Sequence, residues 1–336
     1  MALDVAPVHE QTRARYPDDS GDVERDGVRV FYEVYGSGEP TFLLLPTWSI
    51  IHSRQWKAQI PFLAREHRVV TFDGRGNGRS DRPVDPAAYH PVEFYRDALA
   101  VMDATETERA ITVSTSAGTA WNLLLAAGSP DRVQGAVFAG PTLYAVGPPY
   151  PEWAVAPYNE RFDSYDGFEG QNRYFIGEHY PAFVDFWMRT VLPEPHSTRA
   201  IEFSVGMALD TTPEVVLATL EGSGMDGKDR AADRLAEAGE KLRPVAGAVQ
   251  CPVLVVQGGL ERIAMPHWAQ ALAEDTGGEL LVLPEAGHHP AGRKPVRFNL
   301  ALRAFVDRVH AEVTAPSRED HERLGAWLRD RTTESS

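Results

Sequence analysis

The sequence of 336 residues contains one cysteine, Cys251, and no apolar run that approaches roughly 18 residues. A single cysteine excludes an intrachain disulfide framework and a cysteine-based metal site. Because Cys251 precedes a strongly apolar stretch, we expect it to be a small buried hydrophobic side chain. The lack of a long apolar run argues against a membrane-spanning helix. The first residues also lack an apolar signal core, so we expect a soluble, cytoplasmic protein.

Basic residues are scarce relative to acidic ones. There are 33 Lys and Arg against 48 Asp and Glu, which gives a formal net charge of −15. Nucleic-acid binding needs clustered positive charge, and anionic membrane surfaces need it too, so neither partner is expected. The sequence has no His-Glu-x-x-His motif, no paired cysteines and no glycine-rich phosphate loop, so we expect no metal and no cofactor. A small molecule is the expected partner, and the sequence does not indicate an oligomeric state.

The remaining composition is that of a globular protein, with 43% hydrophobic and 24% charged residues. Short apolar runs that suit buried strands alternate with segments of helical spacing. The strand-like runs are 41–46, 68–73, 110–114 and 133–141, and the helical ones are 54–67, 95–105 and 117–130. This alternation predicts an α/β fold with a mostly parallel, doubly wound sheet. Asp26-Gly27 predicts a hairpin before it.

The alternation stops between residues 142 and 245, where aromatic residues gather and helical signals dominate. Thr212-Pro213-Glu214 is one such signal, because it combines a cap with proline at the first helical position. We therefore expect a helical cap inserted into the α/β core, which resumes with strands at 251–259 and 279–283. The predicted division is an N-terminal arm (1–21), a first core segment (22–141), the cap (142–245), a second core segment (246–314) and a charged tail (315–336).

Five small residues, Ser114 to Gly118, separate the strand at 110–114 from the following helix. Such a strand–turn–helix corner is typical of a nucleophile elbow, in which a strained backbone tolerates only small neighbours. The apex would be Ser116, and the helix that follows would favour negative charge beside it. The simpler alternative is that Ser116 only caps the helix. Ser114 is a weaker nucleophile candidate, because its side chain should point away from the apex.

A serine hydroxyl becomes a nucleophile when a base takes its proton and an acid orients the base. Glu261 and His288 follow the last two predicted strands, so both should lie with Ser116 at the carboxyl edge of the sheet. Glu285 is an alternative acid, although it precedes His288 by only three residues. His289 is the alternative base.

From about residue 22 to residue 312 the sequence resembles the α/β-hydrolase family. The matching stretches are LLLPTWS, TFDGRGNGRSDRP, STSAG, VVQGGLERIAMP and LPEAGHHP. The resemblance implies Ser116 as nucleophile, Glu261 as acid and His288 as base. It also implies an architectural role for the loop at 73–80. A serine apex argues against the members that use an aspartate nucleophile.

Two features depart from the family pattern. Pro46-Thr47 stands where many members have His-Gly, and the acid is glutamate instead of the more common aspartate. The resemblance implies that the backbone N–H groups of Trp48 and Ala117 form the oxyanion hole.

The implied reaction is hydrolysis of an ester, thioester or lactone through an acyl-enzyme, with an apolar part of the substrate under the cap. The residues expected to line the pocket are Thr47, His52, Thr115, Trp153, Phe186 and Trp187. An exposed loop position for His52, and a purely structural role for the cap aromatics, remain alternatives. A non-hydrolytic reaction (C–C cleavage, acyl transfer or cyclisation) and a receptor with a vestigial triad also stay open.

Overall fold

The computed structural model of the chain describes residues 13–225 and 228–314. Its centre is an eight-stranded sheet in the order β1-β2-β4-β3-β5-β6-β7-β8. β2 pairs antiparallel with β1 and β4, and the other pairs are parallel, which confirms the predicted sheet. The strands are β1 (Asp19–Arg25), β2 (Val28–Tyr35), β3 (Phe42–Leu44), β4 (Val69–Phe72), β5 (Ala110–Thr115), β6 (Val133–Ala139), β7 (Val253–Gly258) and β8 (Glu279–Leu283).

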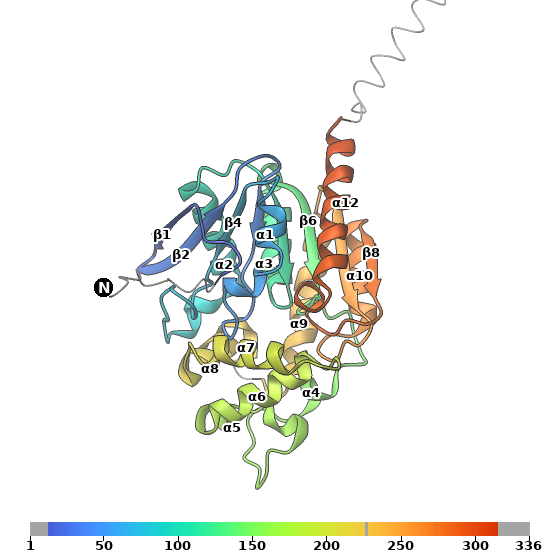
Figure 1. Cartoon of the computed structure of the whole chain (residues 1–336). Coiled ribbons are helices and arrows are strands. Elements are labelled where there is room, and N and C mark those ends of the chain that lie inside the picture. The colour runs from blue at the N-terminus through green and yellow to red at the C-terminus, as the bar shows by residue number, and fades with distance from the viewer. Residues whose placement is uncertain (1–12, 226–227, 315–336) are drawn as a thin grey trace, which may run out of the picture.

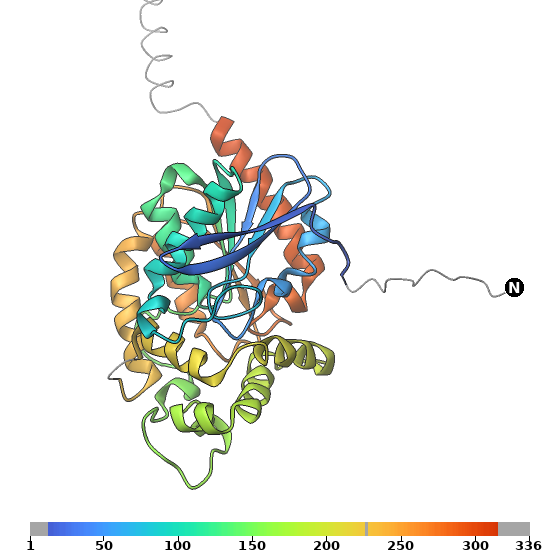
Figure 2. The same cartoon turned by 90° about the vertical axis from the view of Figure 1, so that its left-hand side faces the viewer.

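Helices cover both faces of the sheet, because side chains along each strand alternate between two buried cores. In β3, for example, Leu43 belongs to one core and Leu44 to the other. The first core contains α2 (Pro91–Ala104), α3 (Gly118–Gly128), α9 (Ala231–Ala246) and α10 (Pro266–Thr276). The second contains α1 (Ile60–Leu63), α11 (Pro290–Arg293) and α12 (Pro295–Thr314). Figure 2 shows α12 (red) and α9 (orange) on opposite sides of the sheet.

A layer of short helices lies across the carboxyl ends of the parallel strands (Figure 1). This cap comprises α4 (Glu152–Val155), α5 (Arg173–Glu178), α6 (Tyr180–Val191), α7 (Thr198–Ala208) and α8 (Pro213–Leu220). Thr212 occupies the N-cap of α8, as predicted, and accepts a hydrogen bond from the Val215 N–H at 3.5 Å. The last helix of the predicted insertion is different, because α9 packs against α3 and α10 on the face of the sheet.

The predicted hairpin is confirmed, and the two turn residues Asp26 and Gly27 have φ values of 53° and 76°. Its first strand already begins at Asp19, inside the segment predicted as an arm. The remaining predicted arm, 1–12, and the tail, 315–336, lie outside the described residues.

The helix predicted at 54–67 is broken into η1 (Ser53–Trp56) and α1. Pro61 explains the break, because it has no N–H to donate to the carbonyl four residues earlier, and it lies in the first turn of the new helix α1. Cys251 is partly exposed, although we expected it to be buried. It packs at the edge of the first core.

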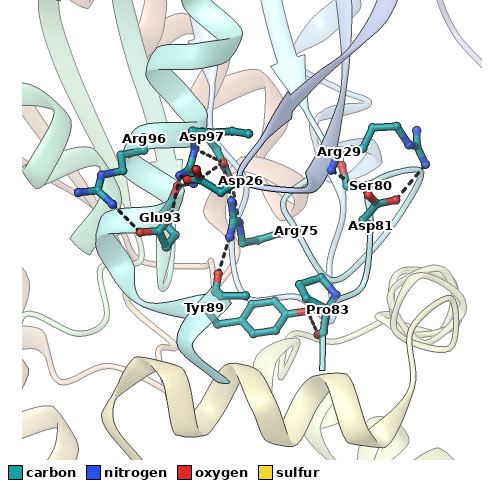
Figure 3. Close-up of polar contacts among 12 residues, drawn as sticks. Asp26, Arg29, Arg75, Ser80, Asp81, Pro83, Tyr89, Glu93, Arg96 and Asp97 are labelled. Carbon is teal, nitrogen blue, oxygen red and sulfur yellow. Dashed lines mark hydrogen bonds and ion pairs between the residues drawn. The ribbon is translucent and has the colours of Figure 1, made fainter. Parts of the chain in front are cut away.

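A buried ion-pair cluster centred on Asp97 holds the loop that follows β4 (Figure 3). The Arg75 guanidinium donates to both carboxylate oxygens of Asp97 at 2.7 Å, and these side chains are 2% and 1% exposed. Arg25, at the end of β1, adds a second cation at 2.8 Å. Arg75 also donates to the Ala88 carbonyl at 2.7 Å, in η2 (Pro86–Tyr89). The cluster therefore joins β1, the loop after β4, η2 and α2.

The loop at residues 73–80 in turn supports the loop that follows β3. Asp73 accepts a hydrogen bond from the Ser53 N–H at 3.0 Å. A Cβ on Gly74 would lie only 2.9 Å from Cβ of Pro46, so the two loops are in close contact. Residues 73–80 therefore make the kind of structural contacts that the predicted architectural role requires.

We predict that Asp97→Ala lowers the free energy of unfolding by about 3–5 kcal/mol, because Arg75 would stay buried without its bidentate counter-charge. Chemical denaturation measures the change. Arg96→Ala is the control, since Arg96 is 56% exposed and pairs with Glu93 at the surface. Such exposed pairs contribute about 0–1 kcal/mol. Equal losses in the two variants would contradict the role given to the buried cluster.

Candidate active site

Ser116 lies at the corner between β5 and α3. Its φ of 51° is in the left-handed region, which costs a residue other than glycine on the order of 1–3 kcal/mol. Backbone contacts hold it there: its N–H donates to the Ala139 carbonyl at 3.1 Å, and its carbonyl accepts from Thr119 Oγ1 at 2.7 Å. Ala117 occupies the N-cap position of α3. The corner therefore presents the Ser116 hydroxyl, which is not used as a helix cap.

The small residues on either side of the corner have different reasons to be small. A Cβ on Gly118 would lie 2.7 Å from the Pro46 carbonyl oxygen, so only glycine permits this approach of α3 to the loop after β3. Ser114 is fully buried, and its hydroxyl accepts a hydrogen bond from Asn122 Nδ2 at 3.1 Å. Ser114 therefore points into the core and does not compete with Ser116.

Three side chains from distant parts of the chain meet above the corner. Nε2 of His288 lies 2.8 Å from Oγ of Ser116, and Nδ1 of His288 lies 2.8 Å from Oε2 of Glu261. The His288 and Glu261 side chains are 6% and 1% exposed. Glu261 follows β7 and His288 follows β8, so the carboxyl ends of parallel strands bring them to one edge of the sheet.

The carboxylate of Glu261 is held by its own turn. Oε1 accepts from the backbone N–H groups of Arg262, Ile263 and Ala264 at 2.8, 2.6 and 3.2 Å. These bonds direct Oε2 at His288. When Nδ1–H of His288 donates to Oε2, Nε2 is left without a proton and can accept one from Ser116, as a general base must.

The alternative acid and base lie elsewhere. The Glu285 side chain is 74% exposed and pairs with Lys294 at 3.1 Å. Within the described residues, His289 makes no hydrogen bond to Ser116, although its ring borders the same cavity.

The backbone N–H groups of Trp48 and Ala117 are available for an oxyanion. In residues 13–225 and 228–314, neither group donates a hydrogen bond to a protein acceptor. The indole of Trp48 donates to Thr219 Oγ1 of α8 at 2.7 Å, which ties the loop after β3 to the cap. Pro46-Thr47 stands where many family members have His-Gly, and the N–H of the next residue, Trp48, is still free to bind an oxyanion.

Two cavities share Ser116 in their walls. The main chamber has a volume of about 130 Å³ and is mostly apolar, with Met188, Leu192 and Phe203 among its walls. The side chamber has a volume of about 70 Å³ and lies toward α9. Trp48, Trp187 and Ile263 also line both chambers.

Four of the six predicted pocket residues line these chambers. Thr47 and Thr115 line the main chamber, Trp153 lines the side chamber, and Trp187 lines both. The rings of Trp153 and Trp187 meet edge to face at 5.2 Å, so the cap contributes an aromatic wall between the two spaces.

His52 and Phe186 are not among the described residues that line either chamber, which corrects the prediction for both. His52 is buried under the β3 loop, where Nδ1 accepts from the Arg54 N–H at 3.4 Å and desolvation lowers its pKa. Phe186 precedes Trp187 on α6, and successive helical residues point about 100° apart. Trp187 faces the chambers, so Phe186 turns toward Gly170.

Glu194 was missed by the sequence analysis. It lies in the cap between α6 and α7, and its Oε1 accepts from the Gly287 N–H at 2.7 Å. Its Oε2 lies 3.4 Å from Nε of Arg293. Glu194 therefore joins the cap to the residue before His288. No motif marks it, because the contact exists only once the cap has folded over the sheet.

In the described ranges, 13–225 and 228–314, no group of three or more His, Cys, Asp or Glu side chains could hold a metal ion. None of the helices in this part of the chain is both long enough and apolar enough to cross a membrane.

Comparison with known proteins identifies the fold family. The family model of the alpha/beta hydrolase fold matches residues 40–295. The chain belongs to this family. Across 84% of its length it is 23% identical to 3-oxoadipate enol-lactonase 2 of Acinetobacter baylyi, of which the match covers 94%. Among solved structures, Est816, an N-acyl homoserine lactone degrading enzyme, is similar with a TM-score of 0.66 and 25% identity, over 85% of this chain and 100% of that one.

Other α/β-hydrolase relatives match over shorter segments. Four curated bacterial proteins are 32–38% identical to this chain, but the aligned segments span only 29–45% of their lengths. One is 2-hydroxymuconate semialdehyde hydrolase of Pseudomonas sp. (strain CF600), 32% identical over 37% of this chain and 45% of that protein.

His289 should make folding sensitive to acid. Burial, followed by like charge from His288, lowers its pKa from 6.5 to about 4. Between these values the unfolded chain binds more protons than the folded one, so stability falls as the pH drops from about 6.5 to about 4. His289→Gln should reduce this loss by on the order of 2 kcal/mol near pH 4.

Denaturation curves at about pH 7 and about pH 4 measure the difference. His179→Gln is the control, because His179 is exposed. Identical pH dependence in wild type and His289→Gln would show that the buried ring does not contribute.

Proposed function

We propose that this protein is a serine hydrolase that cleaves an ester, a thioester or a lactone of a small, partly apolar molecule. The observation that carries the proposal is the 2.8 Å contact between Ser116 Oγ and His288 Nε2, with Glu261 on the far side of the imidazole. A nucleophile, a base and an orienting acid in hydrogen-bond reach form the arrangement that acyl transfer requires. Family membership and the lactone-cleaving relatives support it.

In the first half-reaction, Ser116 Oγ bonds to the substrate carbonyl carbon while His288 Nε2 takes the hydroxyl proton. Glu261 keeps its bond to Nδ1–H and stabilises the imidazolium. The carbonyl oxygen becomes an oxyanion, which the N–H groups of Trp48 and Ala117 bind. Such donors are worth roughly 3–4 kcal/mol each in the transition state. His288 then protonates the leaving oxygen or sulfur, and the carbon–heteroatom bond breaks.

In the second half-reaction, water replaces the leaving group. His288 removes a proton from the water as its oxygen attacks the acyl carbon, and the same proton then returns to Ser116 Oγ when the ester bond to the enzyme breaks. In a lactone the leaving alcohol stays attached to the acyl chain, so the product is a single hydroxy acid.

The walls of the main chamber favour a substrate with an apolar part. Met188, Leu192 and Phe203 present carbon atoms to this space, and its walls are predominantly apolar. The enol-lactonase and the acyl homoserine lactone degrading enzyme act on cyclic esters by their names, so lactones are included in the proposed substrate class.

Ser116→Ala should lower the turnover of p-nitrophenyl butanoate by about 10⁴-fold or more, because the variant lacks the hydroxyl that lies 2.8 Å from His288 Nε2. A fluorophosphonate probe should label wild type at Ser116 and leave the variant unlabelled. A melting curve checks that the variant is folded. If Ser116→Ala keeps wild-type activity, the result would rule out Ser116 as the nucleophile. Labelling of wild type without ester turnover would instead favour a non-hydrolytic reaction at the same serine.

Glu261→Gln should lower kcat by about 10²–10⁴-fold with a smaller change in KM, because the amide can no longer stabilise the imidazolium that forms in the transition state. Glu285→Gln is the matched control, since it alters the nearby exposed carboxylate and should leave kcat near that of wild type. Steady-state kinetics on p-nitrophenyl butanoate compares the two. A larger loss in Glu285→Gln would reassign the acid.

A further inference from the structure

The side chamber contains a single charged residue among the described residues that line it. This residue is Arg234 of α9, and its neighbours in the walls include the aromatic side chains of Trp48, Trp153 and Trp187 and several hydroxyl groups. The chamber also borders Ser116 and Ala117, so it opens onto the nucleophile.

Arg234 is buried, and no carboxylate of the described residues forms an ion pair with it. It is 8% exposed, its Nε lacks a hydrogen-bond partner, and within residues 13–225 and 228–314 it forms no ion pair. Desolvation lowers its pKa to about 10. Arg75, the other deeply buried arginine considered above, has both carboxylate oxygens of Asp97. An unpaired buried cation is costly, so its retention requires an explanation.

The acidic residues nearest along the outer wall are already engaged. Arg234 also borders an outer cavity between α9 and η5 (Glu221–Met225), which contains Glu221 and Glu237. Glu221 pairs with Arg173 at 3.5 Å, and Glu237 pairs with Lys228 at 2.8 Å. Neither carboxylate therefore acts as the counter-charge of Arg234.

Two more buried polar atoms near Arg234 lack partners in the described part of the chain. They are Oη of Tyr158 and Oε1 of Gln171, on residues that are 2% and 3% exposed. Gln171 lines the side chamber, and Arg234 is close enough to Tyr158 to oppose the rise in the Tyr158 pKa that burial causes. The region thus combines a guanidinium, a phenol and a carboxamide whose hydrogen bonds are incomplete.

We infer that the side chamber binds a carboxylate group of the substrate, with Arg234 as its counter-charge. The inference rests on the proposed function, because the chamber shares Ser116 with the main chamber. The planar guanidinium matches a carboxylate in geometry and charge, and the NH2 group of Gln171, which lines the chamber, can donate a further hydrogen bond. Six aromatic side chains in the walls lower the local polarity, which strengthens the attraction between a guanidinium and a carboxylate.

This assignment divides the substrate around the nucleophile. The scissile carbonyl lies at Ser116, the apolar part occupies the main chamber, and an arm that ends in a carboxylate reaches Arg234. The small volume of the side chamber, about 70 Å³, suits a short arm. The substrate class becomes that of acidic esters, thioesters or lactones.

Binding tests the inference without requiring catalysis. In the Ser116→Ala background, calorimetry compares glutarate, adipate and pimelate with their neutral diamides near pH 7.5. At least one dicarboxylate should bind about 10-fold or more tightly than its diamide, since charge-assisted pairs are stronger than neutral ones. Adding Arg234→Met should weaken that dicarboxylate about 10-fold or more. Arg230→Met, at the N-cap of α9, is the matched control, because Arg230 is 49% exposed and pairs with Asp233 at the surface.

Kinetics in the active enzyme gives the second readout. Mono-p-nitrophenyl adipate and p-nitrophenyl hexanoate differ only in the terminal carboxylate. Arg234→Met should lower kcat/KM for the adipate ester at least about 10-fold more than for the hexanoate, mainly through KM. Arg230→Met should preserve the wild-type ratio.

Folding controls keep the test decisive. Met removes an unpaired buried charge, so Arg234→Met should melt at or above the wild-type temperature, whereas an arginine with a structural ion pair would leave the variant less stable. Arg234→Lys, which keeps the charge and loses the fork, should retain part of the preference. The inference is overturned if no dicarboxylate binds better than its diamide in Ser116→Ala, or if Arg234→Met and Arg230→Met have equal effects. If the protein binds a carboxylate but does not turn over esters, the result would contradict the proposed hydrolase activity and still support the carboxylate subsite.

Discussion

The close approach of α3 to the loop after β3 is the contact on which the site depends. With no side chain at Gly118, the Pro46 carbonyl can lie where a Cβ would clash at 2.7 Å. This contact places the strained corner at Ser116 against the loop that carries Trp48, so the proposed nucleophile and the proposed oxyanion donors are held by the same contact. The β3 loop is itself held by Asp73, and the loop of Asp73 by the buried ion pairs of Asp97. The reacting groups are therefore positioned by the core.

The sequence could locate Ser116, Glu261 and His288 for a physical reason. Each follows directly on an apolar run that forms a buried parallel strand, and parallel strands bring their carboxyl ends to one edge. The direction of each side chain is then set by a short turn whose residues are local in sequence. Glu261 shows this well, since its orientation comes from the three N–H groups that follow it. Strand positions and local turns thus specify the triad geometry without knowledge of the cap.

The cap could not be predicted to the same depth, because its contacts depend on how helices pack. Phe186 and Trp187 are neighbours in sequence, yet one residue along α6 decides which of them faces the chambers. Glu194 and Arg234 carry no motif, and their significance appears only when burial and missing partners are known. The failed helix at 54–67 has a simpler cause, since Pro61 outweighed the apolar spacing.

Net charge and the side chamber act on an acidic substrate in opposite directions. The formal charge of −15 repels anions at a distance, but salt at physiological ionic strength screens this repulsion beyond about 8 Å. Arg234 acts at contact distance, where the surrounding protein keeps the effective dielectric constant below that of water. Its charge therefore selects among molecules that have already entered the site and does little to speed their capture. In the free protein the buried cation lacks a counter-charge, which destabilises the fold. A bound carboxylate supplies that counter-charge, so ligand binding should also stabilise the folded protein.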